Sequence, residues 1–295
     1  MTFQNPQYLV ETDWLAEHLN DPDLRIIECN AGLPNYYEDS AGDRIEIVSG
    51  RNDYEQGHIP GSDFVDLVRE LMGQSDNPTM FPMPSAEQFA KVMSRHGIDE
   101  GQRVVLYDRT MNAWSARFWW MLRSFGFDGA VVLNGGWKKW CAENRPVCTT
   151  LPHLSTKKFM VKPRPELMAI KQEVLAAIDE ESVCIINALG PDEFAGRGPD
   201  RYGRQGHIPS SFNVSALGLV DPQTHAYLDA ETLREQFAVT GVFDKDRVIT
   251  YCGGGIAGSS DAFVLTLLGV TSVALYNGSM TEWAADPLLP MEAGD

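Results

Sequence analysis

The residues with the clearest chemical potential are Cys252 and the glycines after it, in the sequence Tyr-Cys-Gly-Gly-Gly-Ile-Ala-Gly at 251–258. The β-branched segment 247–250 predicts a buried strand before them, and 259–268 predicts a helix after them. Open α/β sheets bind ligands at such a strand-to-helix turn. Glycines let successive N–H groups point inward, and a helix N-terminus favours a thiolate over a thiol. The stretch predicts a reactive thiol at Cys252, cradled by Gly253, Gly254, Gly255, Ile256, Ala257 and Gly258.

A second interpretation stays open for Cys252 taken alone. Free cysteines are often buried small hydrophobes, and a glycine turn between a strand and a helix is common in α/β folds. The rest of the chain has to decide between a reactive and an inert thiol.

Strands and helices alternate along the chain. Strands are expected at 25–29, 103–107, 130–133, 183–186, 247–250 and 273–276. Helices are expected at 13–19, 85–97, 113–125, 171–178, 230–239 and 259–268. This alternation predicts an α/β fold with parallel sheets covered by helices on both faces.

The order of elements in the first half returns in the second half. The equivalent pairs are Gly57 and Gly206, Asp108 and Cys252, Gly135 and Gly278, and Trp140 and Trp283, separated by 149, 144, 143 and 143 residues. Near-constant offsets indicate one fold used twice. We predict a first domain at 1–142, a proline-containing linker at 143–165 and a second domain at 166–295. Asp108 stands in the first domain where the second has its cysteine.

Composition and charge limit the function classes. The chain has 295 residues, 43% of them apolar, and a formal net charge of −17, which argues against nucleic acid and anionic membranes as partners. No apolar run approaches a membrane span, and residues 1–10 lack the pattern of a secretory signal. Five cysteines, an odd number, favour a reducing compartment, so we expect a cytoplasmic protein.

Several motifs together resemble the tandem rhodanese-type sulfurtransferases over nearly the whole chain. They are the two Gly-His-Ile-Pro sequences, the loop at 251–257, and the segments 115–123 and 133–137. The resemblance implies two rhodanese-like domains, each with a central parallel sheet flanked by helices on both faces, and an active site between them. Only the second domain would carry the nucleophile.

The resemblance also implies a reaction. Cys252 would take a sulfane sulfur from thiosulfate or 3-mercaptopyruvate, hold it as a persulfide and pass it to cyanide or another thiophilic acceptor. The loop amides would stabilise the anionic sulfur as an oxyanion hole does, and the covalent route predicts ping-pong kinetics. No metal and no organic cofactor is implied.

The loop departs from the family pattern where relatives have polar or basic residues. Gly254 and Ala257 replace hydroxyl-bearing residues, and Leu189 stands where relatives have an arginine. We predict that Arg197, Arg201 and Arg204 supply the missing anion site, because guanidinium binds oxyanions in a bidentate manner. The alternative is that they are solvated loop charges or pair with Asp192, Glu193 and Asp200. We rank thiosulfate ahead of 3-mercaptopyruvate as the donor.

Three other functions are alternatives to a sulfurtransferase. A cysteine phosphatase needs Cys-x5-Arg, and Gly258 occupies the arginine position. A persulfide carrier or sensor would receive sulfur from a partner protein, which fits the missing loop cations and leaves a protein sulfur acceptor open. A binding module with an inert cysteine is the third alternative. His58 and His207 are expected to be structural.

Overall fold

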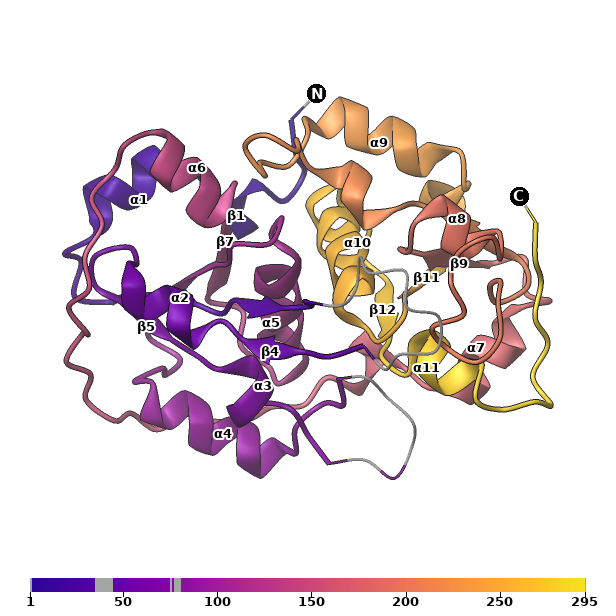
Figure 1. Cartoon of the computed structure of the whole chain (residues 1–295), viewed down its shortest axis with the longest axis horizontal. Coiled ribbons are helices and arrows are strands. Elements are labelled where there is room, and N and C mark those ends of the chain that lie inside the picture. The colour runs from indigo at the N-terminus through magenta and orange to yellow at the C-terminus, as the bar shows by residue number, and fades with distance from the viewer. Residues whose placement is uncertain (1, 35–44, 75, 77–80, 295) are drawn as a thin grey trace.

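Two α/β domains lie side by side along the long axis of the molecule (Figure 1). The computed structural model describes residues 2–34, 45–74, 76 and 81–294. Each domain contains a five-stranded, wholly parallel sheet. The predicted fold class, two domains with central parallel sheets flanked by helices, is confirmed.

The two sheets have the same strand order. The first runs β1 (Leu9–Val10), β7 (Ala130–Leu133), β6 (Arg103–Tyr107), β2 (Leu24–Glu28) and β5 (Ser62–Phe64). The second runs β8 (Met168–Ala169), β12 (Val273–Tyr276), β11 (Arg247–Tyr251), β9 (Val183–Asn187) and β10 (Ser211–Asn213). β6 and β11 are therefore equivalent central strands, and Asp108 and Cys252 follow them directly.

The central strands are apolar because both faces of each sheet are covered. The last four residues of β6 and of β11 are all buried, as expected for strands in a doubly covered parallel sheet. β11 pairs with β9 in parallel from Arg247 opposite Val183 to Tyr251 opposite Asn187. Cys252 and Ala188 therefore leave the sheet at the same edge, beside each other.

The helices surround the two sheets. They are α1 (Thr12–His18), α2 (Arg51–Gln56), α3 (Leu67–Glu70), α4 (Ala86–Arg95), α5 (Ala113–Ser124), α6 (Gly136–Ala142), α7 (Lys171–Ala177), α8 (Pro191–Phe194), α9 (Ala230–Ala238), α10 (Ile256–Leu267) and α11 (Ser279–Trp283). Ser85 caps α4 by accepting a hydrogen bond from the Gln88 N–H, as its sequence predicts.

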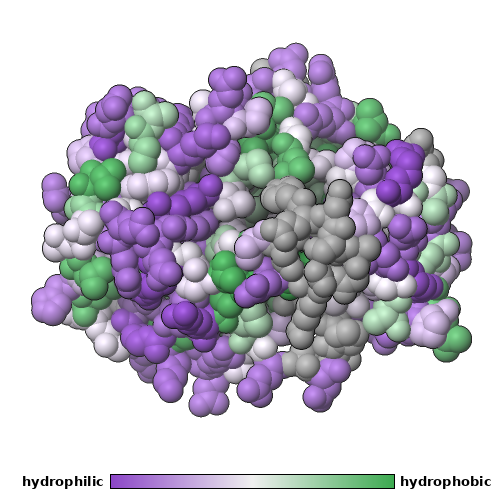
Figure 2. Space-filling view, in the orientation of Figure 1, coloured by the Kyte–Doolittle hydropathy of each residue, from purple (hydrophilic) through white to green (hydrophobic). Residues whose placement is uncertain are grey.

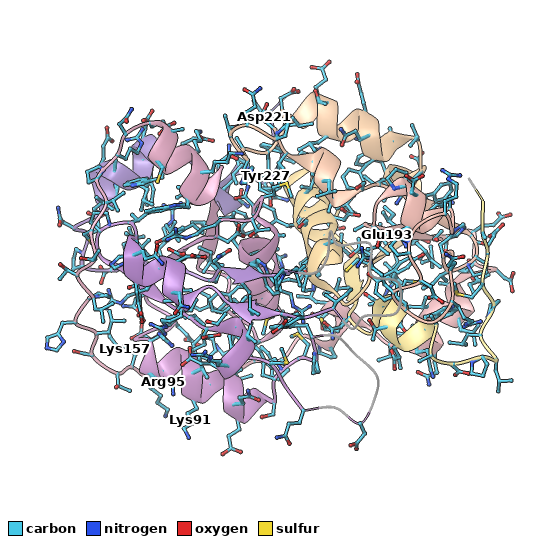
Figure 3. The ribbon with its side chains drawn as sticks, viewed as in Figure 1. Lys91, Arg95, Lys157, Glu193, Asp221 and Tyr227 are labelled. Atoms are coloured by element: carbon cyan, nitrogen blue, oxygen red, sulfur yellow. The ribbon has the colours of Figure 1, made fainter. Side chains whose placement is uncertain are left out.

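Helices α5 and α10 pack against each other at the junction of the two domains (Figure 1). Both are buried almost all round, which is typical of a core helix and not of a surface helix. Trp119 of α5 meets Phe263 of α10 edge to face, with 4.9 Å between ring centroids. Tyr227, labelled in Figure 3, packs on the same phenylalanine at 5.4 Å. The helix that begins near Cys252 is thus fixed against the first domain.

Helix α10 begins three residues earlier than predicted, at Ile256 instead of Ser259. Ile256, Ala257 and Gly258, predicted as loop, form its first turn. Gly255 makes this possible as the N-cap, because its φ of 86° lies in the left-handed region that favours glycine. Gly258 lets the turn approach β11: a Cβ there would lie 3.1 Å from the Tyr251 backbone.

The segment 30–52, where no strand is expected from the sequence, contains a short antiparallel pair. β3 (Ala31–Gly32) pairs with β4 (Val48–Ser49), while 35–44 lie outside the described residues. The prediction failed because two-residue strands carry no measurable alternation of apolar and polar residues.

The linker lies along the first domain, and the N-terminal residues reach the second domain. In the predicted linker, Lys157 N–H and Lys162 N–H donate to the carbonyls of Ser94 and Phe125, so this segment lies along the first domain; Figure 3 shows Lys157 on its outer side. In the opposite direction, the N–H groups of Gln4 and Asn5 donate to Leu267 O at the end of α10.

The surface visible in Figure 2 is mostly hydrophilic, with separate small hydrophobic patches. None of the described helices combines the length and apolarity that crossing a bilayer requires.

Candidate active site

Cys252 lies at the end of β11, with its sulfur at the N-terminus of α10. The residue is 3% exposed and forms part of the wall of a pocket between the domains. The Gly255 N–H donates a hydrogen bond to the Cys252 sulfur at 3.1 Å. A helix N-terminus and an N–H donor both stabilise negative charge on sulfur. The arrangement suits a nucleophilic thiolate.

The start of α11 holds the active-site loop in place. The Cys252 N–H donates to Ser279 Oγ at 3.1 Å, and the Met280 N–H donates to the Cys252 carbonyl at 2.9 Å. Thr281 donates to the Gly253 carbonyl through both its N–H, at 3.0 Å, and its hydroxyl, at 2.6 Å. Sequence reasoning missed this support, which comes from residues 27 and more positions away.

Gly255 tolerates no side chain. Besides its positive φ, a Cβ would lie 2.7 Å from Asn277 Oδ1 and 3.1 Å from Arg117 Nη1. The loop is therefore packed from below by one residue of each domain. Gly254, in the same loop, lines the pocket.

The pocket next to Cys252 has a volume of about 430 Å³ and takes its walls from both domains. Its apolar wall consists of Leu33, Met111, Ala113 and Trp114 of the first domain and Ala188, Leu189, Ala216, Leu217, Ile256 and Ala257 of the second. Such a pocket accepts an organic molecule with a few polar groups. Trp114 is therefore both a buried residue of α5 and part of the pocket wall.

Two of the three predicted arginines reach the pocket. Arg197 and Arg201 line it, together with Asp192 and Glu193; Figure 3 labels Glu193 in the second domain. Arg197 Nε lies 3.2 Å from the Asp192 carboxylate, and Arg201 Nε lies 3.8 Å from that of Glu193. The pairing that the sequence left as an alternative is therefore present, at the rim of the predicted anion site.

Arg204 has different surroundings. Its guanidinium donates hydrogen bonds to four backbone carbonyls, of Trp283 at 3.1 Å, Ala284 at 3.0 Å, Asp286 at 2.7 Å and Leu289 at 2.9 Å. It is not among the residues that line the Cys252 pocket. Its geometry is that of a residue that fastens the C-terminal turn.

A fourth arginine, missed by the sequence prediction, lies beneath the loop. Arg117 of α5 is 0% exposed, and its Nη1 donates to the Gly255 carbonyl at 3.3 Å. Burial lowers the pKa of Arg117 to about 10, and the charge of Cys252 acts in the opposite direction. No sequence signal distinguishes Arg117 from Arg123, the other arginine of this largely apolar helix.

The equivalent loop of the first domain is occupied by its own carboxylate. Asp108 accepts hydrogen bonds from the N–H groups of Thr110 at 2.7 Å, Asn112 at 3.2 Å and Ser115 at 2.7 Å, and from the Ser115 hydroxyl at 2.9 Å. Burial raises the pKa of Asp108, while these hydrogen bonds lower it. The first domain therefore offers no thiol and no open cradle at this position.

The two Gly-His-Ile-Pro histidines are structural, as expected. His58 Nδ1 bonds the Tyr54 carbonyl at 2.8 Å, and His207 Nδ1 bonds the Phe194 carbonyl at 2.7 Å. Each imidazole also stacks on the ring of the same residue, at 4.0 Å and 3.6 Å. Neither histidine lines the Cys252 pocket.

All five cysteines are free. Cys29 and Cys184 are buried, and burial raises the pKa of both thiols. In the described part of the chain, no three His, Cys, Asp or Glu residues are grouped so that they could hold a metal ion.

Comparison with known proteins identifies the fold and its family. The family model for the rhodanese-like domain matches the chain twice, at residues 11–143 and 171–286. The crystal structure of SseA from Escherichia coli, described as a 3-mercaptopyruvate sulfotransferase with the rhodanese fold, matches with a TM-score of 0.79 and 30% identity. That match covers 92% of this chain and 98% of the SseA chain.

Curated relatives match over their full length. The 3-mercaptopyruvate sulfurtransferase of Escherichia coli strain K12 is 32% identical over 291 residues, covering 97% of this chain and 98% of the relative. The sulfur carrier protein TtuD of Thermus thermophilus is 31% identical over 307 residues, covering 100% of both. With two matched domains and full-length relatives above 30% identity, this chain belongs to the rhodanese family, in its tandem two-domain form.

Proposed function

We propose that this protein is a sulfurtransferase in which Cys252 takes a sulfane sulfur from a small anionic donor and passes it to cyanide or another thiophilic acceptor. The observation that carries the proposal is the Cys252 sulfur itself, which sits at a pocket between the domains with the Gly255 N–H 3.1 Å away. Relatives named as sulfurtransferases, matched over 98% and 86% of their own lengths, support it.

The proposed reaction has two displacements. With 3-mercaptopyruvate, the Cys252 thiolate attacks the donor sulfur, the donor carbon–sulfur bond breaks, and the carbon fragment takes a proton to become pyruvate. The Cys252 persulfide then loses its outer sulfur to cyanide, which becomes thiocyanate, and the thiolate returns. The Gly255 N–H and the α10 N-terminus stabilise the anionic sulfur in both steps.

We place 3-mercaptopyruvate ahead of thiosulfate, which reverses the order suggested by the sequence alone. A pocket of about 430 Å³ with an apolar wall suits a donor with a carbon skeleton better than a compact inorganic anion. Leu189, at the position where relatives have an arginine, adds to that wall. Full-length relatives that carry the 3-mercaptopyruvate name support the same order.

Arg197 and Arg201 are the proposed contacts for the donor carboxylate. Both line the pocket, and the Arg201 side chain is only 9% exposed, so a contact with it would be little screened by solvent. Their neighbours Asp192 and Glu193 compete with the donor for the guanidinium groups. Donor binding would therefore exchange one carboxylate partner for another.

The experiment is thiocyanate production from 3-mercaptopyruvate and from thiosulfate, measured side by side. We expect turnover with wild-type protein, faster with 3-mercaptopyruvate, and none with Cys252→Ser. Cys141→Ser is the matched control, because Cys141 is an exposed cysteine away from the pocket. A Cys252→Ser variant that keeps the wild-type rate would refute the site.

A second candidate function is that of a persulfide carrier, with a protein as sulfur donor or acceptor. It is favoured by the apolar Leu189 in place of a cation and by Leu217, which lines the pocket while 53% exposed, where a protein surface could reach it. The Thermus relative named as a sulfur carrier agrees with it. This candidate expects negligible turnover with both small donors, but a persulfide on Cys252 after incubation with a sulfur-donating protein.

We propose a reducing compartment such as the cytoplasm for this chemistry. Five free cysteines, one of them exposed, support it. Oxidation of Cys252 to a disulfide or sulfenic acid would remove the nucleophile.

A further inference from the structure

Arg117 is a buried charge without an acidic partner. It is 0% exposed, and no carboxylate among the described residues lies within ion-pair distance of its guanidinium. Its contacts are the Gly255 carbonyl at 3.3 Å, the Phe81 carbonyl at 3.2 Å and the Met83 sulfur at 3.3 Å. A buried cation without a counter-charge is costly, so such an arrangement needs an explanation.

We propose that Arg117 is the positioning residue and counter-charge of the Cys252 sulfur, in its thiolate and persulfide forms. The inference rests on the proposed function, because the anion that would pair with Arg117 is the same Cys252 sulfur that reacts in the proposed sulfur transfer. The first domain thereby supplies the positive charge that the loop of the second domain lacks.

Gly255 connects the two residues. Its N–H donates to the Cys252 sulfur at 3.1 Å, and its carbonyl accepts from Arg117 at 3.3 Å and from the Ser259 hydroxyl at 2.7 Å. Arg117 therefore fixes the orientation of the glycine that stabilises the anion. A Cβ on Gly255 would lie 3.1 Å from Arg117 Nη1, so the guanidinium packs directly on the loop.

The Phe81 carbonyl joins the same junction from the first domain. It accepts from Arg117 Nη2 and from Asn277 Nδ2, both at 3.2 Å. Arg117 Nε and Asn277 Oδ1 are buried and form no hydrogen bond within the described structure. Polar atoms from both domains thus surround the underside of the loop, which is unusual in a packed interior.

The acidic residue of α10 that could pair with Arg117 in place of the Cys252 sulfur is Asp261. It is fully buried, and neither carboxylate oxygen has a hydrogen-bond partner in the described residues. Burial raises the pKa of Asp261 well above its ordinary value, which favours the neutral carboxyl and weakens Asp261 as a counter-charge at neutral pH. Arg117 keeps its proton there, because burial lowers its pKa only to about 10. The positive charge therefore remains for Cys252.

The test is the pH profile of Cys252 alkylation by iodoacetamide, from about pH 5 to about pH 10, quantified on the Cys252 peptide by mass spectrometry. We expect Arg117→Met to move the midpoint up by about one pH unit, which is about tenfold less thiolate well below the midpoint. Arg117→Lys, which keeps the charge, should stay near wild type. Arg123→Met is the matched control, an arginine of the same helix that lies over Tyr8 and Trp119.

A midpoint for Arg117→Met equal to that of wild type and Arg123→Met would overturn the proposal. Arg117→Gln, which keeps an amide donor towards Gly255 but no charge, is the second neutral variant and is expected to shift like the methionine variant. A measurement without any variant is the Tm of wild-type protein before and after loading Cys252 with polysulfide. We expect a higher Tm for the persulfide form, and an equal or lower Tm would contradict the proposal.

A failure of the Arg117 proposal can be distinguished from a failure of the proposed function. Thiocyanate formation by Cys252→Ser would refute that function, whereas the alkylation midpoint concerns only the ionisation of the sulfur.

Discussion

Asp108 and Cys252 each follow the central strand of their own sheet, and the side chain of each accepts at least one hydrogen bond from a backbone N–H a few residues further along the chain. The Asp108 carboxylate accepts from three such groups, and the Cys252 sulfur from that of Gly255. Duplication thus produced two loops of one design. One loop is filled by the carboxyl group of Asp108, and the other holds a sulfur atom that can react.

The buried Asp108 carboxyl predicts a stability effect. Asp108→Ala should lower the free energy of unfolding by about 2–4 kcal/mol, because buried N–H donors lose their acceptor. Asp229 is the matched control, since it also accepts from two backbone N–H groups but at an exposed helix N-cap. Asp229→Ala should cost about 1 kcal/mol or less. Urea unfolding measures the free energy of unfolding of both variants. Equal losses would contradict the prediction that the buried Asp108 contributes more stability than the exposed Asp229.

The different surroundings of Arg201 and Arg204 predict different defects. Arg201→Met should raise KM for 3-mercaptopyruvate about tenfold or more, by loss of a charge-assisted contact, with an unchanged Tm. Arg204→Met removes one hydrogen-bond donor from each of four carbonyls, so it should lower the Tm while KM stays within about twofold for the folded protein. Steady-state kinetics and thermal unfolding distinguish the two. The opposite pattern would return the anion site to Arg204.

The backbone of Gly255 predicts a catalytic defect. Gly255→Ala forces a Cβ into a residue with φ of 86° and against Asn277 and Arg117, which displaces the N–H that faces the sulfur. We expect kcat/KM to fall by about 100-fold or more, since displacements of about 1 Å have such effects. Gly218→Ala is the control, because nothing lies within 4 Å of the added carbon. Two variants of equal activity would mean that the Gly255 N–H has no role.

An acid cluster in the first domain predicts a loss of stability at alkaline pH. His96 Nδ1 lies 2.5 Å from Asp63, and its Nε2 lies 3.3 Å from Glu70. Burial by itself lowers the pKa of His96, but the hydrogen bonds to Asp63 and Glu70 raise it to about 9. Because this pKa exceeds the roughly 6.5 of the unfolded chain, the stabilisation is complete below about pH 6.5 and is lost as pH rises through about 9.

We therefore expect the free energy of unfolding to fall by about 2 kcal/mol between about pH 7 and about pH 10 from this residue. His96→Gln should remove that part of the pH dependence, whereas His153→Gln, at an exposed position, should leave it unchanged. Urea unfolding across this range is the measurement. An identical slope in wild type and His96→Gln would contradict the assignment.

Local patterns were sufficient for much of the fold. β6, β7 and β12 have the predicted bounds, because each is a short apolar run that turn residues enclose. The repeat placed Asp108 opposite Cys252, and the glycines after Cys252 predicted a loop that holds a thiol. The division at 143–165 stays a prediction, and so does the catalytic role of Cys252, which the experiments on Cys252 address.

What the sequence could not supply are contacts between distant segments. Arg117 meets Gly255 across 138 positions, and Ser279 meets Cys252 across 27. Neither pairing leaves a mark in the local composition. For Arg204, the local sequence suggested a contact that the structure does not contain. Its position among three arginines suggested an anion site, but its N–H groups donate to carbonyls of the C-terminal turn.

The central claim is that the Cys252 sulfur accepts sulfur from a donor. Its most direct measurement is the mass of the Cys252 peptide after brief incubation with 3-mercaptopyruvate in the absence of acceptor, followed by the same measurement after cyanide is added. We predict one extra sulfur atom on that peptide, lost again with cyanide as thiocyanate appears. An unmodified Cys252 peptide while thiocyanate still accumulates on adding cyanide would contradict the account.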